Sequence, residues 1–450
     1  MPAAKTFVLY PSLGVGHLIP MVELAKHLLR HGHEVVFAVV DPPDSDAVSA
    51  VAVASLAAAN PSITFRLLPA PPSPDPTAHP VKRSLDTLRL ANPVLRDLLL
   101  SLPAPGADAL LLDMFCVDAL DVAAELAVPA YFFFPSAAGD LAVFLNLPYI
   151  SPNLSSFKDM GKTLVHIPGM PPVRAVDMPQ TMQDKEGDPN KVRLYQFRRI
   201  AEGRGVLADS PGVLHWAAGE RRREERRGQG EPHECLAWLD AQPLRSVVFL
   251  CFGSKGAFSA TQLREIARGL ESSGHRFLWA VRSPPEEQSE VPEPDLERLL
   301  PTGFLERTRG RGMVVKNWVP QAEVVRHEAV GAFVTHWGWN STLEAIMSGL
   351  PMICWPLYAE QALNKMFMVE ETKIAVALAG YEDGMVKAEE VEAKLRLVME
   401  AEEGRKLREM LVATRKMALD AISQGGSSEV AFAEFLEDLE KSSMENAEFN

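Results

Sequence analysis

A histidine and an aspartate each stand where a predicted strand ends in the first quarter of the chain. His17 follows Gly14-Val15-Gly16 after the expected strand 7–10 and opens a helix, and Asp113 directly follows the expected strand 109–112. Because the carboxyl ends of parallel strands meet at one edge of an open sheet, the two side chains can lie together. A buried carboxylate bonded to one imidazole nitrogen fixes the tautomer and leaves the other nitrogen to accept a proton. The pair therefore predicts general-base chemistry.

The same glycine turn invites comparison with the dinucleotide-binding fingerprint. Asp41, just past the second expected strand, could hold a ribose in that interpretation. The third glycine is missing, because the position that it requires is Ile19, and Pro20 follows. An NAD(P)-dependent oxidoreductase is therefore the weaker alternative.

A second group of polar and aromatic residues lies between 318 and 361. The expected strand 332–335 leads through His336-Trp337-Gly338-Trp339-Asn340-Ser341-Thr342 into a helix that carries Glu344. A helix N-terminus offers backbone N–H groups and a positive dipole end to a phosphate. Glu344 could accept from a ribose diol, and the indole of Trp318 could stack on a base. The segment therefore predicts a nucleotide site.

This segment resembles the signature box of plant secondary-product glycosyltransferases, which are members of the UDP-glycosyltransferase superfamily. Gly16-His17-Leu18-Ile19-Pro20 and the segment 113–116 resemble the catalytic pair of the same family. The residues of the box that carry the resemblance are Trp318, Pro320, Gln321, His327, Gly331, Thr335, His336, Gly338, Trp339, Asn340, Ser341, Leu343, Glu344, Gly349, Pro351, Trp355, Pro356, Glu360 and Gln361.

The resemblance implies a UDP-sugar as co-substrate, without a cofactor or a metal. Trp318 would stack on uracil, Val319 and Gln321 would bond its edge, and Glu344 would hold the ribose. Trp337 replaces the Cys that most members carry. The remaining implied donor-binding residues are His336, Asn340, Ser341 and Ser254 around the diphosphate, Trp339, Glu360, Gln361 and Ser136 around the sugar, and Gly338.

The resemblance also implies the reaction. His17 would deprotonate an acceptor hydroxyl and Asp113 would orient it, with inversion at the anomeric carbon. The closing Gln361 is associated with glucose, so the donor would be UDP-glucose. Acceptors in this family are small phenolics such as flavonoids, which suits the aromatic residues Phe115, Phe132 to Phe134 and Phe144.

Composition sets the size of the fold and excludes several partners. A chain of 450 residues exceeds what one hydrophobic core usually serves, so two domains are expected. Its formal net charge of −14 disfavours nucleic acid as a partner. We expect no membrane span, no disulfides among the four separated cysteines, a cytoplasmic location and a monomer. His27 and His31 are spaced one turn apart, but no third ligand accompanies them in the sequence, so no metal site is expected there.

Alternating strand and helix patterns predict an α/β fold with two doubly wound domains. Strands are expected at 7–10, 35–40, 63–68, 109–112 and 131–134, and again at 247–252, 277–281, 313–316, 332–335 and 352–354. The resemblance implies that two Rossmann-like domains of the GT-B type face each other across a cleft. The expected divisions are an acceptor-binding domain over 1–208, an Arg-rich linker over 209–245, a UDP-sugar-binding domain over 246–424, and a C-terminal helix and tail over 425–450.

The linker departs from the family pattern. Residues 211–230 are Arg-rich, shorter than expected and lack the apolar strand that members of the family usually carry after this point. Charge runs usually mean solvated chain. A UDP-sugar-binding protein with impaired catalysis therefore stays open as an alternative.

Overall fold

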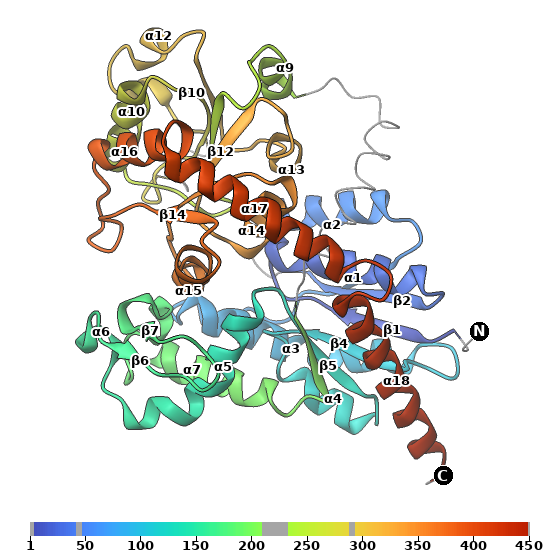
Figure 1. Ribbon diagram of the computed structural model, residues 1–450. Coiled ribbons are helices and arrows are strands. Elements are labelled where there is room, and N and C mark those ends of the chain that lie inside the picture. Colours follow the sequence, from blue (N-terminus) through green and yellow to red (C-terminus); the bar gives the residue numbers. More distant parts are fainter. Residues whose placement is uncertain (1–3, 42–46, 209–232, 288–292, 449–450) are drawn as a thin grey trace. The chain divides into compact units, whose positions relative to one another are not determined.

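A computed structural model describes residues 4–41, 47–208, 233–287 and 293–448 (Figure 1). The chain divides into two compact units. The first unit combines Met1–Glu224 with Ala421–Asn450, and the second is Glu225–Asp420. The expected linker segment 211–230 lies outside the described residues.

The first unit is built on a parallel sheet of six strands in the order β3-β2-β1-β4-β5-β8. The chain starts in the middle of the sheet, builds one side, and returns to build the other, which is the doubly wound order of a Rossmann fold. The strands are β1 Thr6–Tyr10, β2 Glu34–Val40, β3 Thr64–Leu68, β4 Ala109–Asp113, β5 Ala130–Phe134 and β8 Gly205–Ala208. A separate antiparallel pair joins β6 Leu164–Val165 and β7 Val173–Arg174.

Helices connect the strands of the first unit. Buried residues of α1 (Val15–Arg30), such as Met21 and Leu28, belong to the same core cluster as Phe7 and Leu9 of β1. The other helices are α2 Ala47–Ala59, α3 Pro80–Leu100, α4 Ala119–Glu125, α5 Ala138–Ile150, α6 Phe157–Met160 and α7 Asp188–Ile200, with short 3-10 turns at Ser151–Asn153, Ala175–Asp177 and Gln180–Met182.

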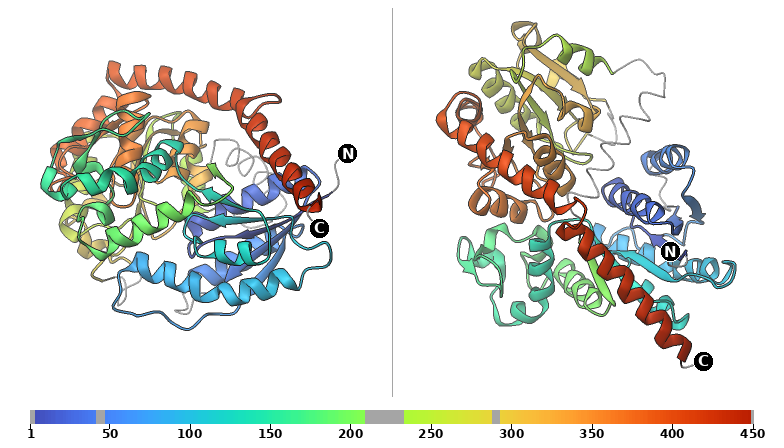
Figure 2. Two further views of the ribbon diagram at one scale, coloured as in Figure 1. Left: turned by 90° about the horizontal axis from the view of Figure 1, so that it is seen from below. Right: turned by 45° about the vertical axis from the view of Figure 1, so that its right-hand side comes forward.

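The last helix, α18 (Ser427–Glu448), covers the same face of the first sheet as α1. Its residues Phe432, Phe435 and Leu439 are buried in the core cluster that α1 also lines. On the same helix Asp438 accepts a hydrogen bond from the Tyr131 hydroxyl at 2.6 Å. The chain thus returns to the first unit after completing the second, and Figure 2 shows this helix in red at the end of the chain.

The second unit repeats the same strand order, β11-β10-β9-β12-β13-β14, again with all strands parallel. Alternate residues of the central strand β9 enter different core clusters, with Val248 and Leu250 in one and Val247 and Phe249 in the other. Burial on both faces explains why this segment is a continuous apolar run. The strands are β9 Val247–Cys251, β10 Arg276–Val281, β11 Gly312–Lys316, β12 Val330–Thr335, β13 Met352–Cys354 and β14 Ala375–Ala377.

The helices of the second unit carry clear boundary signals. In α10 (Ala260–Ser273), Ser259 caps the start by accepting from the Gln262 N–H, and Gly274 ends the helix in the left-handed region. The others are α9 Glu234–Asp240, α11 Leu296–Leu299, α12 Phe304–Arg307, α13 Gln321–Val324, α14 Trp339–Ser348, α15 Gln361–Met366 with a π-helical turn at Phe367–Glu371, α16 Ala388–Met399 and α17 Glu402–Ala421.

All ten expected strands are present, within one or two residues at their ends, so the doubly wound α/β class is confirmed. Two edge strands, β8 and β14, were not expected. Both are short, of four and three residues, and most of their positions are only partly buried, so they carry no strong apolar pattern.

Candidate active site

His17 and Asp113 meet at the carboxyl ends of two neighbouring strands. β1 pairs with β4 in parallel, with Tyr10 opposite Leu112, so the residues that follow these strands lie at one edge of the sheet. His17 lies in the first turn of α1, and its Nδ1 is 2.8 Å from Oδ2 of Asp113. This edge is the point where the strand order reverses, which is where open α/β sheets bind ligands.

The environment of Asp113 fixes the role of each imidazole nitrogen. The carboxylate is fully buried, and its Oδ1 accepts from the Phe115 N–H at 3.0 Å. A carboxylate accepts hydrogen bonds, so Nδ1 of His17 carries the proton and Nε2 is the nitrogen that can take another. The side chain of His17 keeps 29% of its surface exposed. The arrangement is that of a general base with a buried orienting partner.

An aromatic group adjoins this pair. The Phe115 ring contacts the His17 ring edge-on, with centroids 5.3 Å apart. The buried guanidinium of Arg193 lies over Phe115 at 5.2 Å and also over Phe144 and Phe197. No sequence signal pointed to Arg193, because only Phe197 lies on its own helix α7, and Phe115 and Phe144 come from other parts of the chain.

The expected acceptor-lining aromatics are only partly supported. Phe115 is half-buried and contacts His17, as a lining residue would. Phe132 to Phe134 and Phe144 are instead packed in the core, each no more than 2% exposed. Phe132 to Phe134 lie on β5, an interior strand that buries both of its faces, and Phe144 lies on the buried side of α5.

The predicted diphosphate site begins where β12 ends. β12 lies beside β9 at the reversal point of the second sheet, and α14 starts at Trp339 after the turn His336 to Gly338. No acidic residue stands in the first turn of α14, so nothing there opposes an anion.

His336 is held tightly in this turn. A Cβ added at Gly253 or at Gly338 would come within 2.6 or 2.7 Å of its ring. Burial lowers the pKa of His336 to about 4, so the imidazole is neutral near pH 7. Trp337, the residue in place of the usual Cys, is fully buried and takes a left-handed φ of 69°.

The side chain of Gln321 contacts two other predicted donor-binding residues. The Gln321 amide donates to Oγ of Ser341 and to Oε2 of Glu344, both at 2.9 Å. The resemblance had directed the Gln321 side chain to the uracil edge, whereas here it lies among the expected ribose and phosphate groups.

The residue that is expected to stack on the nucleotide base is exposed. Trp318 is 62% exposed and touches His233 only edge-on, at 5.7 Å between ring centroids. The side chain of Val319 is buried, so a bond from this residue to a base would come from its backbone.

The remaining predicted donor-binding residues lie in different environments. Oε1 of Gln361 accepts from the N–H groups of Leu357 and Tyr358, which fixes this amide. Glu360 precedes it at the N-cap of α15. Ser254 is exposed in the loop that follows β9.

Two further predicted donor-binding residues lie at the start of α14. Within the described part of the chain, the buried indole N–H of Trp339 has no hydrogen-bond partner. Asn340 lies in the first turn of α14 and is half-buried.

Ser136 lies in the first unit, and its hydroxyl has a partner on α5. Its hydroxyl is buried and donates to Oδ2 of Asp140 at 2.8 Å. The sequence showed a small hydroxyl residue after a strand but not this partner one turn further along α5.

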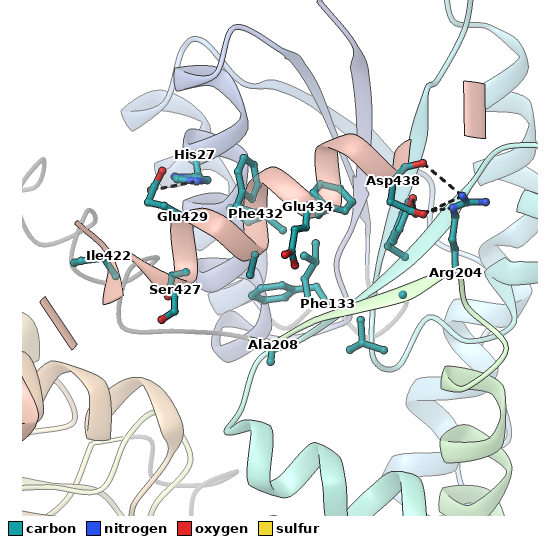
Figure 3. A pocket seen from close by; sticks show the side chains of 18 residues that line it. His27, Phe133, Arg204, Ala208, Ile422, Ser427, Glu429, Phe432, Glu434 and Asp438 are labelled. Carbon is teal, nitrogen blue, oxygen red and sulfur yellow. Dashed lines mark hydrogen bonds and ion pairs between the residues drawn. The ribbon is translucent and has the colours of Figure 1, made fainter. Parts of the chain in front are cut away.

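A pocket of about 570 Å³ lies elsewhere in the first unit, under α18 (Figure 3). Its wall includes Tyr131, Phe133, Phe432 and Phe435. Neither His17 nor Asp113 lines it, so this pocket is separate from the candidate base.

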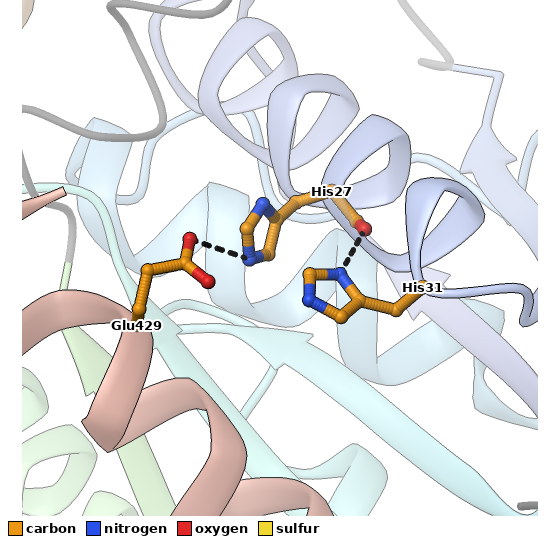
Figure 4. Close-up of side chains that lie close together, drawn as sticks. All are labelled: His27, His31 and Glu429. Carbon is orange, nitrogen blue, oxygen red and sulfur yellow. Dashed lines mark hydrogen bonds and ion pairs between the residues drawn. The ribbon is translucent and has the colours of Figure 1, made fainter. Parts of the chain in front are cut away.

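The expectation that His27 and His31 lack a third ligand is wrong. Glu429 of α18 comes close to both, and one ligand atom from each of the three residues lies within 4.8 Å of the others (Figure 4). Glu429 is remote in the sequence, so spacing along α1 could not reveal it.

Comparison with known proteins agrees with this fold and these residues. The family model for UDP-glucoronosyl and UDP-glucosyl transferase matches residues 226–411. Anthocyanidin 5,3-O-glucosyltransferase from a Rosa hybrid cultivar is 39% identical, over 95% of this chain and 97% of its own.

Two solved structures extend the likeness to the fold. A UDP-glucosyltransferase from Polygonum tinctorium that can glucosylate indoxyl, in complex with 3,4-dichloroaniline, has a TM-score of 0.84 and 36% identity, covering 97% of this chain and 99% of that one. Medicago truncatula UGT71G1 with UDP-glucose has a TM-score of 0.82 and 29% identity, covering 97% and 98%.

The fold and these comparisons together define a sugar-nucleotide-dependent transferase with two Rossmann-like domains of the GT-B type. The chain belongs to the UDP-glycosyltransferase family and is a glycosyltransferase of plant type. The proteins compared above are all glycosyltransferases, which argues against the oxidoreductase alternative. Among the described residues, no helix is both long and apolar enough to cross a bilayer.

Proposed function

We propose that this protein transfers glucose from UDP-glucose to a hydroxyl of a small phenolic acceptor, with His17 as the base. The observation that carries the proposal is the 2.8 Å bond between Nδ1 of His17 and the buried carboxylate of Asp113, at the reversal point of the first sheet. A histidine that only supported the fold would not need a fully buried anionic partner beside a half-exposed ring.

The proposed reaction is one displacement. Nε2 of His17 takes the proton of the acceptor hydroxyl as its oxygen attacks the anomeric carbon of the sugar. The bond from that carbon to the diphosphate breaks, and UDP leaves with the electron pair. One displacement inverts the configuration of the sugar. Asp113 keeps its hydrogen bond with Nδ1 throughout and stabilises the imidazolium that forms.

The start of α14 would stabilise the negative charge that develops on the diphosphate as UDP leaves. Its backbone N–H groups and the side chains of Asn340 and Ser341 would surround the diphosphate, and neutral His336 would donate a single hydrogen bond. Glu344 would hold the ribose once Gln321 turns away from it. Trp318 is an open face for the uracil. No step in this scheme uses a metal ion.

We propose phenolic acceptors on two grounds. The relative from the Rosa cultivar is named for an anthocyanidin, which is a phenolic compound. The partly exposed Phe115 ring beside His17 offers an apolar face to an aromatic acceptor. We further propose that the enzyme works as a cytoplasmic monomer.

The test is product formation by the purified chain. It is incubated with UDP-glucose and a panel of flavonoids and other phenols, and products are identified by mass spectrometry. We expect the addition of one hexose to at least one phenol, without added metal and in the presence of EDTA. Binding of UDP, measured by calorimetry, without any product would instead support the impaired binding protein.

A further inference from the structure

Two histidines and a glutamate converge on the side of the first unit away from His17. His27 and His31 lie one turn apart on α1, so their rings share one face of that helix. Glu429 reaches them from the first turn of α18 (Figure 4). Nε2 of His27 is 4.0 Å from Oε1 of Glu429, and the two ring centroids are 4.6 Å apart.

The ring of His31 is already oriented by the helix. Its Nδ1 lies 2.9 Å from the carbonyl oxygen of His27, to which it donates. A histidine that donates from one nitrogen to a carbonyl presents the lone pair of the other nitrogen, which is the usual arrangement for a metal-ligating histidine. Nε2 of His31 is therefore the atom available to a metal.

Packing holds the two helices together at this point. The Phe432 ring contacts the His27 ring at 4.2 Å and the His31 ring at 4.9 Å between centroids. Phe432 lies one turn after Glu429 on α18, and it is buried. The three ligand side chains thus come from two helices whose mutual position is fixed by a core contact.

We propose that His27, His31 and Glu429 bind one zinc-class divalent ion. Two imidazoles and one carboxylate are a donor set typical of Zn²⁺, with the fourth position left to water. Mg²⁺ and Ca²⁺ prefer oxygen ligands only. Ligand atoms about 2.0–2.1 Å from a tetrahedral ion lie roughly 3.3–3.4 Å apart. Closing the cluster from 4.8 Å to that separation requires ligand atoms to approach one another by about 1.5 Å, which side-chain rotation supplies.

One contact has to change when the ion binds. Nη2 of Arg30 lies 3.2 Å from Nδ1 of His27 and donates to it. A neutral imidazole that binds a metal through Nε2 carries its proton on Nδ1, so the guanidinium of Arg30 must swing away. Arg30 is exposed, and water can take over this hydrogen bond.

The ion would act on the fold and not in the sugar transfer. His17 opens α1 whereas His27 lies in its last turn, and ten residues of helix separate the two by about 15 Å. The ion would instead fasten α18, the helix that returns to the first unit, to α1.

The test is metal binding to the full chain after treatment with EDTA. Zn²⁺ is titrated by calorimetry, and Co²⁺ is titrated by its visible absorption. We expect one ion per chain, and at least tenfold weaker binding in each of the variants His31→Gln and Glu429→Gln. Both side chains are partly or fully exposed, so the variants should fold. His166→Gln, which changes an exposed histidine outside the cluster, should bind like the parent.

A second readout is the thermal unfolding of the same proteins. Zn²⁺ should raise the unfolding temperature of the parent and of His166→Gln but not that of Glu429→Gln, and Mg²⁺ should have no effect. Equal binding by the parent and both cluster variants would overturn the proposal, as would no binding at millimolar Zn²⁺. A thiolate-to-cobalt absorption band would also overturn it, by assigning the ion to the cysteines, which are buried in the folded chain.

Discussion

Two glycines determine where the ring of His336 can lie. Gly253 has a φ of +72°, and a Cβ there would lie 2.6 Å from the ring. A Cβ added at Gly338 would lie 2.7 Å from Nε2 of His336. The loop after β9 and the turn after β12 can therefore meet around this imidazole only because two side chains are absent.

Gly253→Ala should disrupt the diphosphate site. We expect a loss of about 2 to 5 kcal/mol in the free energy of unfolding, from the steric clash and the left-handed backbone together, and at least tenfold weaker binding of UDP. Gly274→Ala is the matched control, because Gly274 has a φ of +73° with nothing within 4 Å of the added Cβ. It should cost only about 1 to 2 kcal/mol and leave the affinity for UDP unchanged. Equal effects of the two substitutions on UDP binding would contradict this account.

Burial of His336 also predicts a pH dependence of stability. Its pKa falls from 6.5 to about 4 on folding, so the protonated ring is disfavoured in the folded state. The stabilisation is complete above about pH 6.5 and is lost as the pH falls toward 4, by about 3 kcal/mol in all. Urea unfolding from pH 7 to pH 4.5 should show a shallower loss for His336→Asn than for the parent. Parallel profiles would show that this ring titrates normally.

At the residue scale, the sequence predicted the chemical types of the candidate site residues better than the directions in which their side chains point. The meeting of His17 and Asp113 followed from their places after two strands, and β1 and β4 are neighbours. The side chains of Gln321 and Ser136 turn to partners on nearby turns of helix, Glu344 and Asp140. Such choices depend on rotamers and close neighbours, which spacing along the chain does not encode.

At the scale of secondary-structure elements, helix α14 is the one that we expect to bind the anionic diphosphate. It starts at the carboxyl end of β12, and its first turn contains no acidic residue. An acid in the first turn would stabilise the free helix by about 0.3–1 kcal/mol, yet it would repel a diphosphate. Stability and ligand binding should therefore respond in opposite directions to a charge placed there.

Asn340→Asp makes this change with almost no change in shape. We expect the affinity for UDP to fall at least tenfold while the free energy of unfolding stays equal or rises slightly. Thr261→Asp, at the exposed start of α10, is the control, because that helix also lacks an acid in its first turn. It should leave UDP binding unchanged in the same calorimetric titration. If Asn340→Asp binds UDP as the parent does, the diphosphate lies elsewhere.

The elements that sequence predicts well are those buried on both faces. β9 is apolar at every position and β4 is apolar up to its last residue, Asp113, and every position of both strands is buried, so both strands were clear from the sequence. The edge strands β8 and β14 are paired on one side only, and their three or four residues are too few for a periodic pattern. Their place depends on the neighbouring strand more than on their own sequence.

At the scale of the whole molecule, the last two helices carry the chain from the second unit back to the first. α17 belongs to the second unit through Asp420, and α18 belongs to the first. The sequence predicted a C-terminal helix within 425–450, but not that α18 would supply Phe432 and Phe435 to the core beside α1. Contacts between the two ends of a chain are not visible in local sequence patterns.

Phe435→Ala should weaken the first unit alone. Its ring is 7% exposed and contacts Phe7 and Tyr131, so its removal should cost about 3 kcal/mol or more in that unit. UDP binding, which we assign to the second unit, should be unchanged in calorimetry at a temperature where both units are folded. Val430→Ala, on an exposed position of the same helix, is the control and should cost less than 1 kcal/mol. Loss of UDP affinity in Phe435→Ala would show that UDP binding by the second unit depends on the packing of the first unit.

The most direct test of the central claim is the turnover of His17→Ala with UDP-glucose and an accepted phenol, with His166→Ala as a control. Removing the base should lower kcat about 10² to 10⁴-fold, while the dissociation constant for UDP stays within about twofold of the parent value. The control should match the parent in both quantities. A His17→Ala protein that forms the glucoside at the parent rate would contradict the assignment of His17 as the base.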